Sequence, residues 1–406
     1  MGIWASSRAI FSGIVLLALI SVLAACGSGE DTPPSEVSLF EKLLGTIPDT
    51  PDTRKSVMIN DYAAVREIFD VPLPGPEAGE AALLEYITGI LGPENMSHLT
   101  EGPFIVGISG AAMGNSRREY LAFDGRNVDQ SVEAGMVPNI LEVAWGRFDP
   151  KATAQALASC SECPPPEIET YNDVPFYSWG EDFQGNLRER RNPPAFDHLG
   201  RGGRIAVTSE YVYRTVETPG MKALIDSRRG DGQTLADVEE FRLLAQAMSS
   251  LGAYTAFFSS RTYKVSVIPE ESSGLNAFLA NNFPEVIDSM QAVYKKLVAE
   301  IGNSTLLLPY QAFSTGAGVD DDGPYMALAL VHSDAESAEE NGRRQQIRIE
   351  DALNYPELDD WRDGLEEYSF LVDGRILSAT MRGDGPASMW RSLAFLWIPT
   401  PLIPHE

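Results

Sequence analysis

Short hairpin signals are the feature that most restricts how this chain can fold. Asp373-Gly374 separates two runs with apolar residues at alternate positions, 368–372 and 375–381, and such a pair is typical of a two-residue β-hairpin. Asn172-Asp173 divides the stretch 167–179 in the same way. A hairpin joins antiparallel neighbours, whereas parallel strands need a long crossover connection. The sequence therefore predicts mainly antiparallel sheets.

Capping signals place helices between the hairpins. Asp149-Pro150 combines an N-cap residue with proline at the first helical position, and predicts a helix that runs to about Ser159. The segments 234–237 and 333–336 have the spacing of capping boxes, in which a hydroxyl and a carboxylate three residues apart satisfy free backbone N–H groups. Each of these boxes predicts the start of a further helix.

The same order of elements occurs twice along the chain. A strand, a capped helix and a hairpin are expected around 140–180 and again around 325–382. We therefore predict an α+β fold of two related halves, each a sheet with helices packed on one face. The expected first half covers 38–270 and the second 271–406. A body of this length is long enough for two domains, or for one built by duplication.

The first 25 residues have the composition of a secretory signal peptide. One basic residue, Arg8, precedes an apolar run over 14–23 that only Ser21 interrupts. This run is shorter than the about 20 apolar residues that a membrane-spanning helix needs. We therefore expect the segment 1–25 to direct export and to be removed.

The end of this segment, Leu23-Ala24-Ala25-Cys26, resembles the lipobox of bacterial lipoproteins. The resemblance implies that diacylglycerol is attached to the thiol of Cys26 and that cleavage occurs before this residue. An ordinary signal peptide with a coincidental cysteine is the alternative. Residues 26–37 are small, acidic and proline-containing, and predict a flexible tether. The lipid would hold the protein in the cell envelope, on the outer face of the plasma membrane or on the outer membrane.

The charge of the chain limits its partners. It has 31 basic and 58 acidic side chains and a net charge of −27, which becomes −28 when 1–25 is removed with Arg8. Binding to phosphate depends on Lys and Arg, so such a surface disfavours nucleic acid and anionic lipid head groups. We expect attachment to the membrane through the N-terminal lipid, and no nucleic-acid partner.

Cys160 and Cys163 form a CxxC motif. A redox-active pair needs its first cysteine at a helix N-terminus, where the helix dipole lowers the thiol pKa. This pair instead follows the helix expected over 150–159 and precedes three prolines, 164–166. A zinc site would need two further ligands, and the sequence has no second CxxC or closely spaced histidine pair. We therefore predict a local disulfide, formed outside the cytoplasm.

The four histidines lie far apart, without the close spacing of common metal sites: His98, His198, His332 and His405. We therefore expect no metal site and no cofactor. Ser109 lies in a Gly-Ile-Ser-Gly-Ala segment that resembles a nucleophile elbow but lacks its last glycine. A histidine-based catalytic site could still form in the fold, because such partners meet only in three dimensions. The sequence thus assigns no catalytic residue.

The acidic run Asp320-Asp321-Asp322-Gly323 is interpreted as a hairpin turn and not as a calcium loop. With Gly323 at the sixth loop position, Gly318 and Ala329 occupy the first and twelfth, where calcium loops carry Asp and Glu. An Asp-Gly pair between two expected strands instead fits a tight turn.

A loop rich in arginine stands out in this acidic chain. It spans 188–204, contains prolines and glycines, and has Trp179, Phe196 and His198 nearby. Arginines beside aromatic rings suit a carboxylate, a phosphate or an acidic glycan. The alternative is that they pair with the protein's own acids. The candidate anion-binding residues are Arg188, Arg190, Arg191, Arg201 and Arg204.

Two short motifs resemble those of a family of poorly characterised bacterial lipoproteins. They are Gly125-Arg126-Asn127-Val128-Asp129 and Gly146-Arg147-Phe148-Asp149, the second of which joins a strand to a helix. The resemblance implies an exported lipoprotein with a hairpin that ends near Tyr177. It implies no catalytic residue.

Together these features predict a non-catalytic binding or interaction module that is anchored by lipid in the cell envelope. Its partner would be another envelope protein or an anionic ligand. The alternative is an extracytoplasmic hydrolase whose site forms only in the fold, with a histidine beside a carboxylate and a Ser or Cys. A transport-linked solute-binding protein is a third hypothesis, which the short helices and antiparallel strand pairs disfavour.

Overall fold

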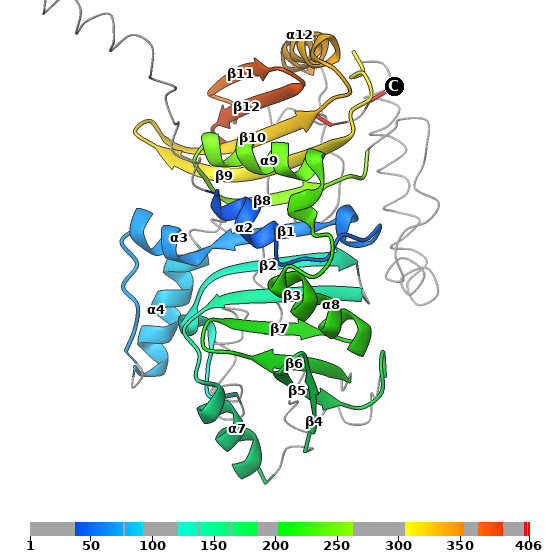
Figure 1. Cartoon of the computed structure of the whole chain (residues 1–406). Coiled ribbons are helices and arrows are strands. Elements are labelled where there is room, and N and C mark those ends of the chain that lie inside the picture. The colour runs from blue at the N-terminus through cyan, green and yellow to red at the C-terminus, as the bar shows by residue number, and fades with distance from the viewer. Residues whose placement is uncertain are drawn as a thin grey trace, which may run out of the picture. The chain divides into compact units, whose positions relative to one another are not determined.

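A twelve-stranded sheet organises the structure (Figure 1). The computed structural model describes residues 37–75, 78–91, 121–136, 139–161, 165–184, 202–262, 305–352, 364–384, 402–403 and 405–406. The strand order is β11-β12-β10-β9-β8-β1-β2-β3-β7-β6-β5-β4, and every neighbouring pair is antiparallel. The strands are β1 (Val57–Asp61), β2 (Val128–Met136), β3 (Asn139–Gly146), β4 (Glu167–Tyr171), β5 (Val174–Trp179), β6 (Gly203–Val207), β7 (Tyr211–Thr215), β8 (Ala253–Ser259), β9 (Ala312–Asp320), β10 (Gly323–Val331), β11 (Glu367–Asp373) and β12 (Ile376–Arg382). The predicted α+β class with antiparallel pairing is confirmed.

Helices lie between these strands in the chain, and Ser38–Glu406 forms one compact unit. The α-helices are α2 (Leu39–Leu44), α3 (Tyr62–Ile68), α4 (Glu80–Leu91), α7 (Pro150–Ser159), α8 (Thr218–Arg229), α9 (Glu239–Ser250) and α12 (Ala335–Ala352). Short 3-10 turns are η1 (Thr53–Lys55), η2 (Gly125–Asn127) and η4 (Leu235–Asp237). Among the described residues, none of the helices has both the length and the apolar character that crossing a membrane requires.

Both faces of the sheet are covered by helices. α2, α8 and α9 pack on one face, called here the α9 face, and α3, α4, α7 and α12 contribute to the core of the other, the α12 face. On β10, Leu328 and Leu330 point to the α12 face, whereas Ala327 and Ala329 point to the α9 face. A strand that is buried on both sides is apolar almost throughout, because each face packs against a core. The structure therefore has helices on both faces of the sheet, whereas the sequence pattern predicted them on one face.

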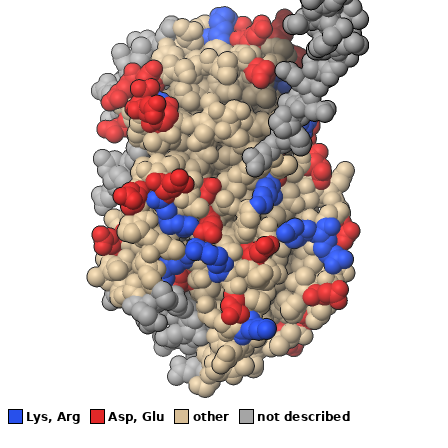
Figure 2. Space-filling view, turned by 60° about the vertical axis from the view of Figure 1, so that its left-hand side comes forward, with Lys and Arg blue, Asp and Glu red and all other residues tan. Residues whose placement is uncertain are grey.

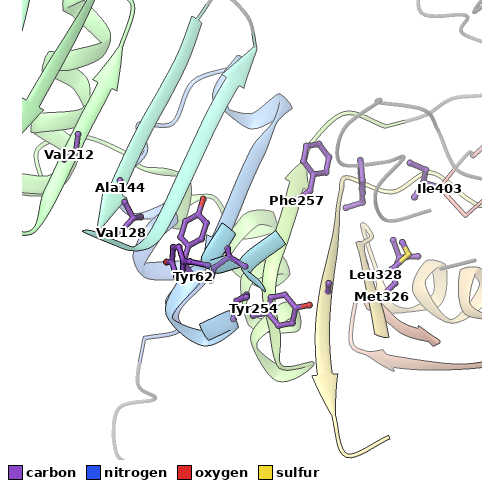
Figure 3. Close-up of a cluster of buried hydrophobic side chains, with 14 of the residues drawn as sticks. Tyr62, Val128, Ala144, Val212, Tyr254, Phe257, Met326, Leu328 and Ile403 are labelled. Carbon is purple, nitrogen blue, oxygen red and sulfur yellow. The ribbon is translucent and has the colours of Figure 1, made fainter. Parts of the chain in front are cut away.

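The core of the α12 face extends along the sheet (Figure 3). It runs from Val212 on β7, past Tyr62 of α3 and Tyr254 of β8, to Met326 and Leu328 on β10. This shared core, together with the unbroken strand pairing, joins the two ends of the sheet into one unit.

The order of strands repeats on either side of the central pair β1 and β8. Outward from β1, the hairpin β2–β3 is followed in the chain by α7 and the hairpin β4–β5. Outward from β8, the hairpin β9–β10 is followed by α12 and the hairpin β11–β12. The hairpin β6–β7 lies between β3 and β5 and has no counterpart on the other side. This repeat places β8 with the second set, ahead of the boundary expected at 270, and β8 pairs across that boundary with β9.

Local turn and cap signals explain where several elements begin and end. Asn172 and Asp173 have φ of 47° and 65°, and Gly374 has φ of 54°, so both predicted hairpins turn through the left-handed region. The Asp149 carboxylate accepts hydrogen bonds from the N–H groups of Lys151 and Ala152, as predicted for the start of α7.

Two of the predicted helix starts are displaced. The capping box of Thr234 and Asp237 is present, but it opens the 3-10 turn η4, and α9 begins only at Glu239. At α12 the cap is Asp334, whose Oδ1 accepts from the N–H of Ser337 at 2.7 Å. Ser333, expected as the cap, donates its hydroxyl to Asp334 instead, because α12 begins at Ala335 and the residue directly before it is Asp334.

The Gly-x-Phe-Asp motif after β3 has a structural role at each position. A Cβ on Gly146 would lie 1.9 Å from the backbone oxygen of Asn127, so only glycine lets the two segments approach. Phe148 packs edge-on against Phe123 with ring centroids 5.2 Å apart, and Asp149 caps α7. The motif therefore fixes how α7 leaves the sheet.

Candidate functional site

Several residues singled out in the sequence lie outside the described part of the chain: Cys26, His98, Ser109, Cys163, Arg188, Arg190, Arg191, His198 and Arg201. The roles expected for them stay predictions. Cys160, Arg204, His332, His405 and the turn at 320–323 are described.

Cys160 is the C-cap of α7. Its N–H donates to the oxygen of Ala156 at 3.1 Å, and its half-buried side chain packs against the core of the α12 face. The cysteine thus lies at the C-terminal end of the helix, where the helix dipole does not lower the pKa of a thiol. Its pairing with Cys163 stays a prediction.

Arg204, on β6, is almost fully buried, with 6% of its side chain exposed. Its Nη2 lies 2.8 Å from Asp182 Oδ1, and its Nε donates to Thr218 Oγ1 at 2.9 Å. Asp182 also accepts from the N–H of Thr218 at the start of α8. Arg204 therefore pairs with one of the protein's own carboxylates, as the alternative interpretation of the arginine-rich loop expects. Its contacts also connect β6 to the start of α8.

Other described arginines pair in the same way. Asp129 lies 2.5 Å from Arg66 and 3.2 Å from Arg147, and Asp124 binds the guanidinium of Arg126. On the face drawn in Figure 2, most basic side chains lie beside acidic ones. The Arg147–Asp129 pair is largely exposed and adds little stability, whereas Arg66 and Arg126 are mostly buried; all three pairs neutralise cations of an acidic chain.

The turn at 320–323 is the predicted hairpin between β9 and β10. Asp320 pairs with Arg382 on β12 at 2.5 Å and also accepts from the N–H of Asp322. In the described ranges, no group of three or more His, Cys, Asp or Glu side chains could hold a metal ion.

His332, at the end of β10, is fully buried, and both its ring nitrogens have partners. Nδ1 lies 3.2 Å from the backbone oxygen of Arg375, and Nε2 lies 2.8 Å from Asn341 Nδ2. The Asn341 amide is oriented by Leu308, since its Oδ1 accepts from that N–H and its Nδ2 donates to that oxygen. Asn341 therefore donates to Nε2, and the imidazole is neutral with its proton on Nδ1.

His405 lies in the C-terminal segment, close to the inner side of α12. Its Nδ1 is 2.8 Å from the oxygen of Glu406, and its ring packs edge-on against Tyr310. Tyr310 donates its hydroxyl to Ile403, and Gln345 of α12 donates to Leu402. The two described histidines therefore help to hold α12 and the last residues of the chain in place.

A different cluster joins exposed charge to aromatic rings on the α9 face. Trp145 on β3 stands opposite Tyr211 on β7, and their rings are stacked with centroids 5.8 Å apart and an angle of 11°. Lys42 of α2 places its Nζ 2.9 Å from the centre of the Trp145 ring. Arg228 of α8 lies over the Tyr211 ring at 4.7 Å. We call Lys42, Trp145, Tyr211 and Arg228 the cation–aromatic stack.

The two cations of this stack are incompletely neutralised. Lys42 is exposed and makes no ion pair with any described residue. Arg228 is paired at 3.9 Å with Glu210, and both side chains are about half exposed or more, at 49% and 62%. Partial desolvation, followed by the charge of Arg228, lowers the pKa of the Lys42 ammonium, and Glu210 opposes this effect. The stack is thus a local excess of positive charge on an acidic body.

Nothing in the sequence marks this cluster. Lys42 and Arg228 come from short amphipathic helices, and Trp145 and Tyr211 meet through the register of β3 and β7. The alternation of residues 141–145 predicts a strand with Trp145 on one face, but not which partner lies beside it. Only the pairing of distant strands assembles the site.

Comparisons with known proteins add little. No protein-family model and no curated protein matches the chain. Among solved structures, crystal forms III, I and IV of a protein named TP0453 give TM-scores of 0.36, 0.33 and 0.35 at 10%, 8% and 12% identity. The matches cover 86%, 89% and 86% of this chain and 98%, 100% and 96% of that protein. Similarity this weak supports no conclusion about fold or function.

Proposed function

We propose that this protein is a lipid-anchored lipoprotein of the cell envelope whose folded body is a non-catalytic binding module. The observation that carries the proposal is Leu23-Ala24-Ala25-Cys26 at the end of a signal-like segment. Acylation of the Cys26 thiol would leave residues 26–37 between the lipid and Ser38, which caps α2 and starts the compact unit. The body would then be held outside the cytoplasm, on the plasma membrane or the outer membrane.

The cation–aromatic stack supports a binding role for the body. Exposed cations are scarce in a chain with 58 acidic and 31 basic residues, and Lys42 is one that lacks a carboxylate partner among the described residues. Trp145 is partly exposed beside it, so the stack offers both an anion contact and an apolar surface. An anionic ligand or an acidic face of another envelope protein fits this chemistry.

The hydrolase alternative gains no support from the described histidines. It requires a histidine beside a carboxylate and a nucleophile, whereas the ring nitrogens of His332 are bonded to Asn341 and to a backbone oxygen. His405 faces Tyr310 and the backbone of Glu406. Only His98 and His198, outside the described residues, are left for that hypothesis.

Metabolic labelling tests the anchor. The full chain is expressed in a bacterial host with an alkyne fatty acid, and the N-terminal peptide is analysed by mass spectrometry. We expect label on a chain that begins at Cys26 with diacylglycerol attached, and no label on Cys26→Ala. Cys160→Ser with Cys163→Ser is the matched control and should keep the label. An intact Met1, or an unacylated product in the cytosol, would overturn the proposal.

The same preparation tests the second cysteine assignment. We propose that Cys160 and Cys163 form a disulfide after export, which would fix the turn that follows α7. The non-reduced peptide spanning both residues should be lighter than the reduced peptide by two hydrogens. Two free thiols in the exported protein would contradict this assignment.

A further inference from the structure

The folded body begins close to the cation–aromatic stack. Ser38 caps α2, and Lys42 lies on the same short helix, so the stack is near the point where the tether ends. The tether of residues 26–37 spans at most about 42 Å when fully extended. As a flexible chain it has a root-mean-square length of about 19 Å. If Cys26 is acylated, α2 is therefore held near the membrane surface.

The chemistry of the stack matches the head-group region of a bilayer. Phospholipid phosphates are anions, and Lys42 and Arg228 supply exposed cations that one carboxylate, Glu210, only partly neutralises. Of the two rings only that of Trp145 is partly exposed, since Tyr211 is buried, and tryptophan is enriched where membranes meet water. The expected mature chain has a net charge of −28 with these cations included, so an anionic surface repels the body as a whole and favours contact through a face that carries cations.

We propose that the cation–aromatic stack is the face with which the anchored body rests on phospholipid head groups, with Lys42 and Arg228 binding the phosphates. This inference rests on the proposed lipidation, because a free body of this charge would not gather at a membrane. Tethering raises the effective concentration of the two surfaces, so a contact too weak to recruit the body is populated once the lipid is inserted. The charge of the whole chain argues against recruitment, but not against orientation after anchoring.

Lysine footprinting measures this contact directly. Full-length lipidated protein is reconstituted in vesicles of phosphatidylcholine with about 30% phosphatidylglycerol and treated with a membrane-impermeant acylating reagent. We expect modification of Lys42 to be at least about threefold slower than in Cys26→Ala mixed with the same vesicles. Lys151 on α7 should react equally in both proteins. Mass spectrometry of the same samples reports acylation of Cys26, so a failure of anchoring is distinguished from a failure of contact.

Matched variants separate head-group binding from other causes of protection. Arg228→Gln should restore most of the Lys42 reactivity on vesicles, whereas Arg229→Gln, whose guanidinium pairs with Asp231, should not. About 0.5 M salt should also restore it, since the contact is electrostatic. Equal reactivity of Lys42 in anchored and unanchored protein would overturn the proposal. Protection by a hyaluronan hexasaccharide without vesicles, together with none by vesicles, would assign the stack to an acidic glycan instead.

Discussion

Glu142 and Arg214 face each other across β3 and β7, with Arg214 Nη1 3.0 Å from Glu142 Oε2 and 3% and 6% of the side chains exposed. They point to the α12 face, where Ala144 and Val212 beside them belong to the apolar core. A buried ion pair gains little overall, because the loss of hydration opposes the attraction between the charges. Removing one partner is strongly destabilising, since the charge of the other residue then stays in the core without this ion pair.

We therefore expect Arg214→Met to lower the free energy of unfolding by about 3–5 kcal/mol, measured by urea titration. Replacing both residues together, Glu142→Leu with Arg214→Met, should recover most of this loss. Arg228→Met is the control, because its pair with Glu210 is exposed and should change stability by less than about 1 kcal/mol. Equal effects of the two single arginine variants would mean that burial of the pair does not matter.

The environment of His332 predicts a dependence of stability on pH. Burial lowers the pKa of this imidazole below its usual 6.5, and a proton on Nε2 would face the Asn341 amide that donates to it. The unfolded chain therefore binds the proton first. The stabilisation is complete above about pH 6.5 and decreases as the pH falls below it, by at most about 1.4 kcal/mol per pH unit.

Melting temperatures near pH 7.5 and pH 5 test this effect. The decrease between them should be smaller in His332→Gln, whose amide oxygen can accept from Asn341 and does not titrate. The other three histidines remain in both proteins, so the difference between the variants isolates His332. An identical decrease in the two proteins would mean that His332 is protonated as easily in the fold as in the unfolded chain.

Signals that lie within a few residues of each other predicted the fold well. The hairpin at Asp373-Gly374 and the cap at Asp149 need only their own neighbours, and both are present in the structure. By contrast, β1 is only five residues long and pairs with β2 and β8, which follow it by about 70 and about 200 residues. No local pattern marks such a strand, and the central position of β1 could not be predicted.

The candidate site was even harder to predict from local sequence patterns than the position of β1. Proximity in sequence suggested a site of several arginines, but β6 directs Arg204 to Asp182 and away from solvent. Lys42 and Arg228 are 186 positions apart in the chain and share a site only because α2 and α8 pack on the same face of the sheet. Charge composition alone indicated that the body avoids anionic surfaces, because it averages over local regions such as this stack, where one carboxylate, Glu210, faces two cations.

The cap of α7 allows a sharp test of a local interaction. Asp149 accepts from two N–H groups of the first turn, and Asp149→Ala leaves them to water, so stability should fall by about 1 kcal/mol. Asp149→Asn keeps an acceptor oxygen, so its loss of stability should be only a few tenths of the loss in Asp149→Ala. Urea unfolding of the three proteins measures the difference. A loss as large in the asparagine variant would show that charge, and not the hydrogen bonds, is what the helix end requires.

Two glycines predict opposite outcomes for the same substitution. Gly146→Ala would place its Cβ 1.9 Å from the backbone oxygen of Asn127, which accepts from Arg147 at 2.8 Å and cannot move without breaking that bond. We expect a loss of about 2–3 kcal/mol in the free energy of unfolding. Gly342 lies inside α12, where a Cβ would meet Leu377 and Val372 at 3.4 and 3.5 Å, an ordinary packing distance. Since alanine favours a helix interior over glycine, Gly342→Ala should raise stability by about 0.5–1 kcal/mol. A destabilised Gly342→Ala would mean that α12 packs more tightly on β11 and β12 than these distances imply.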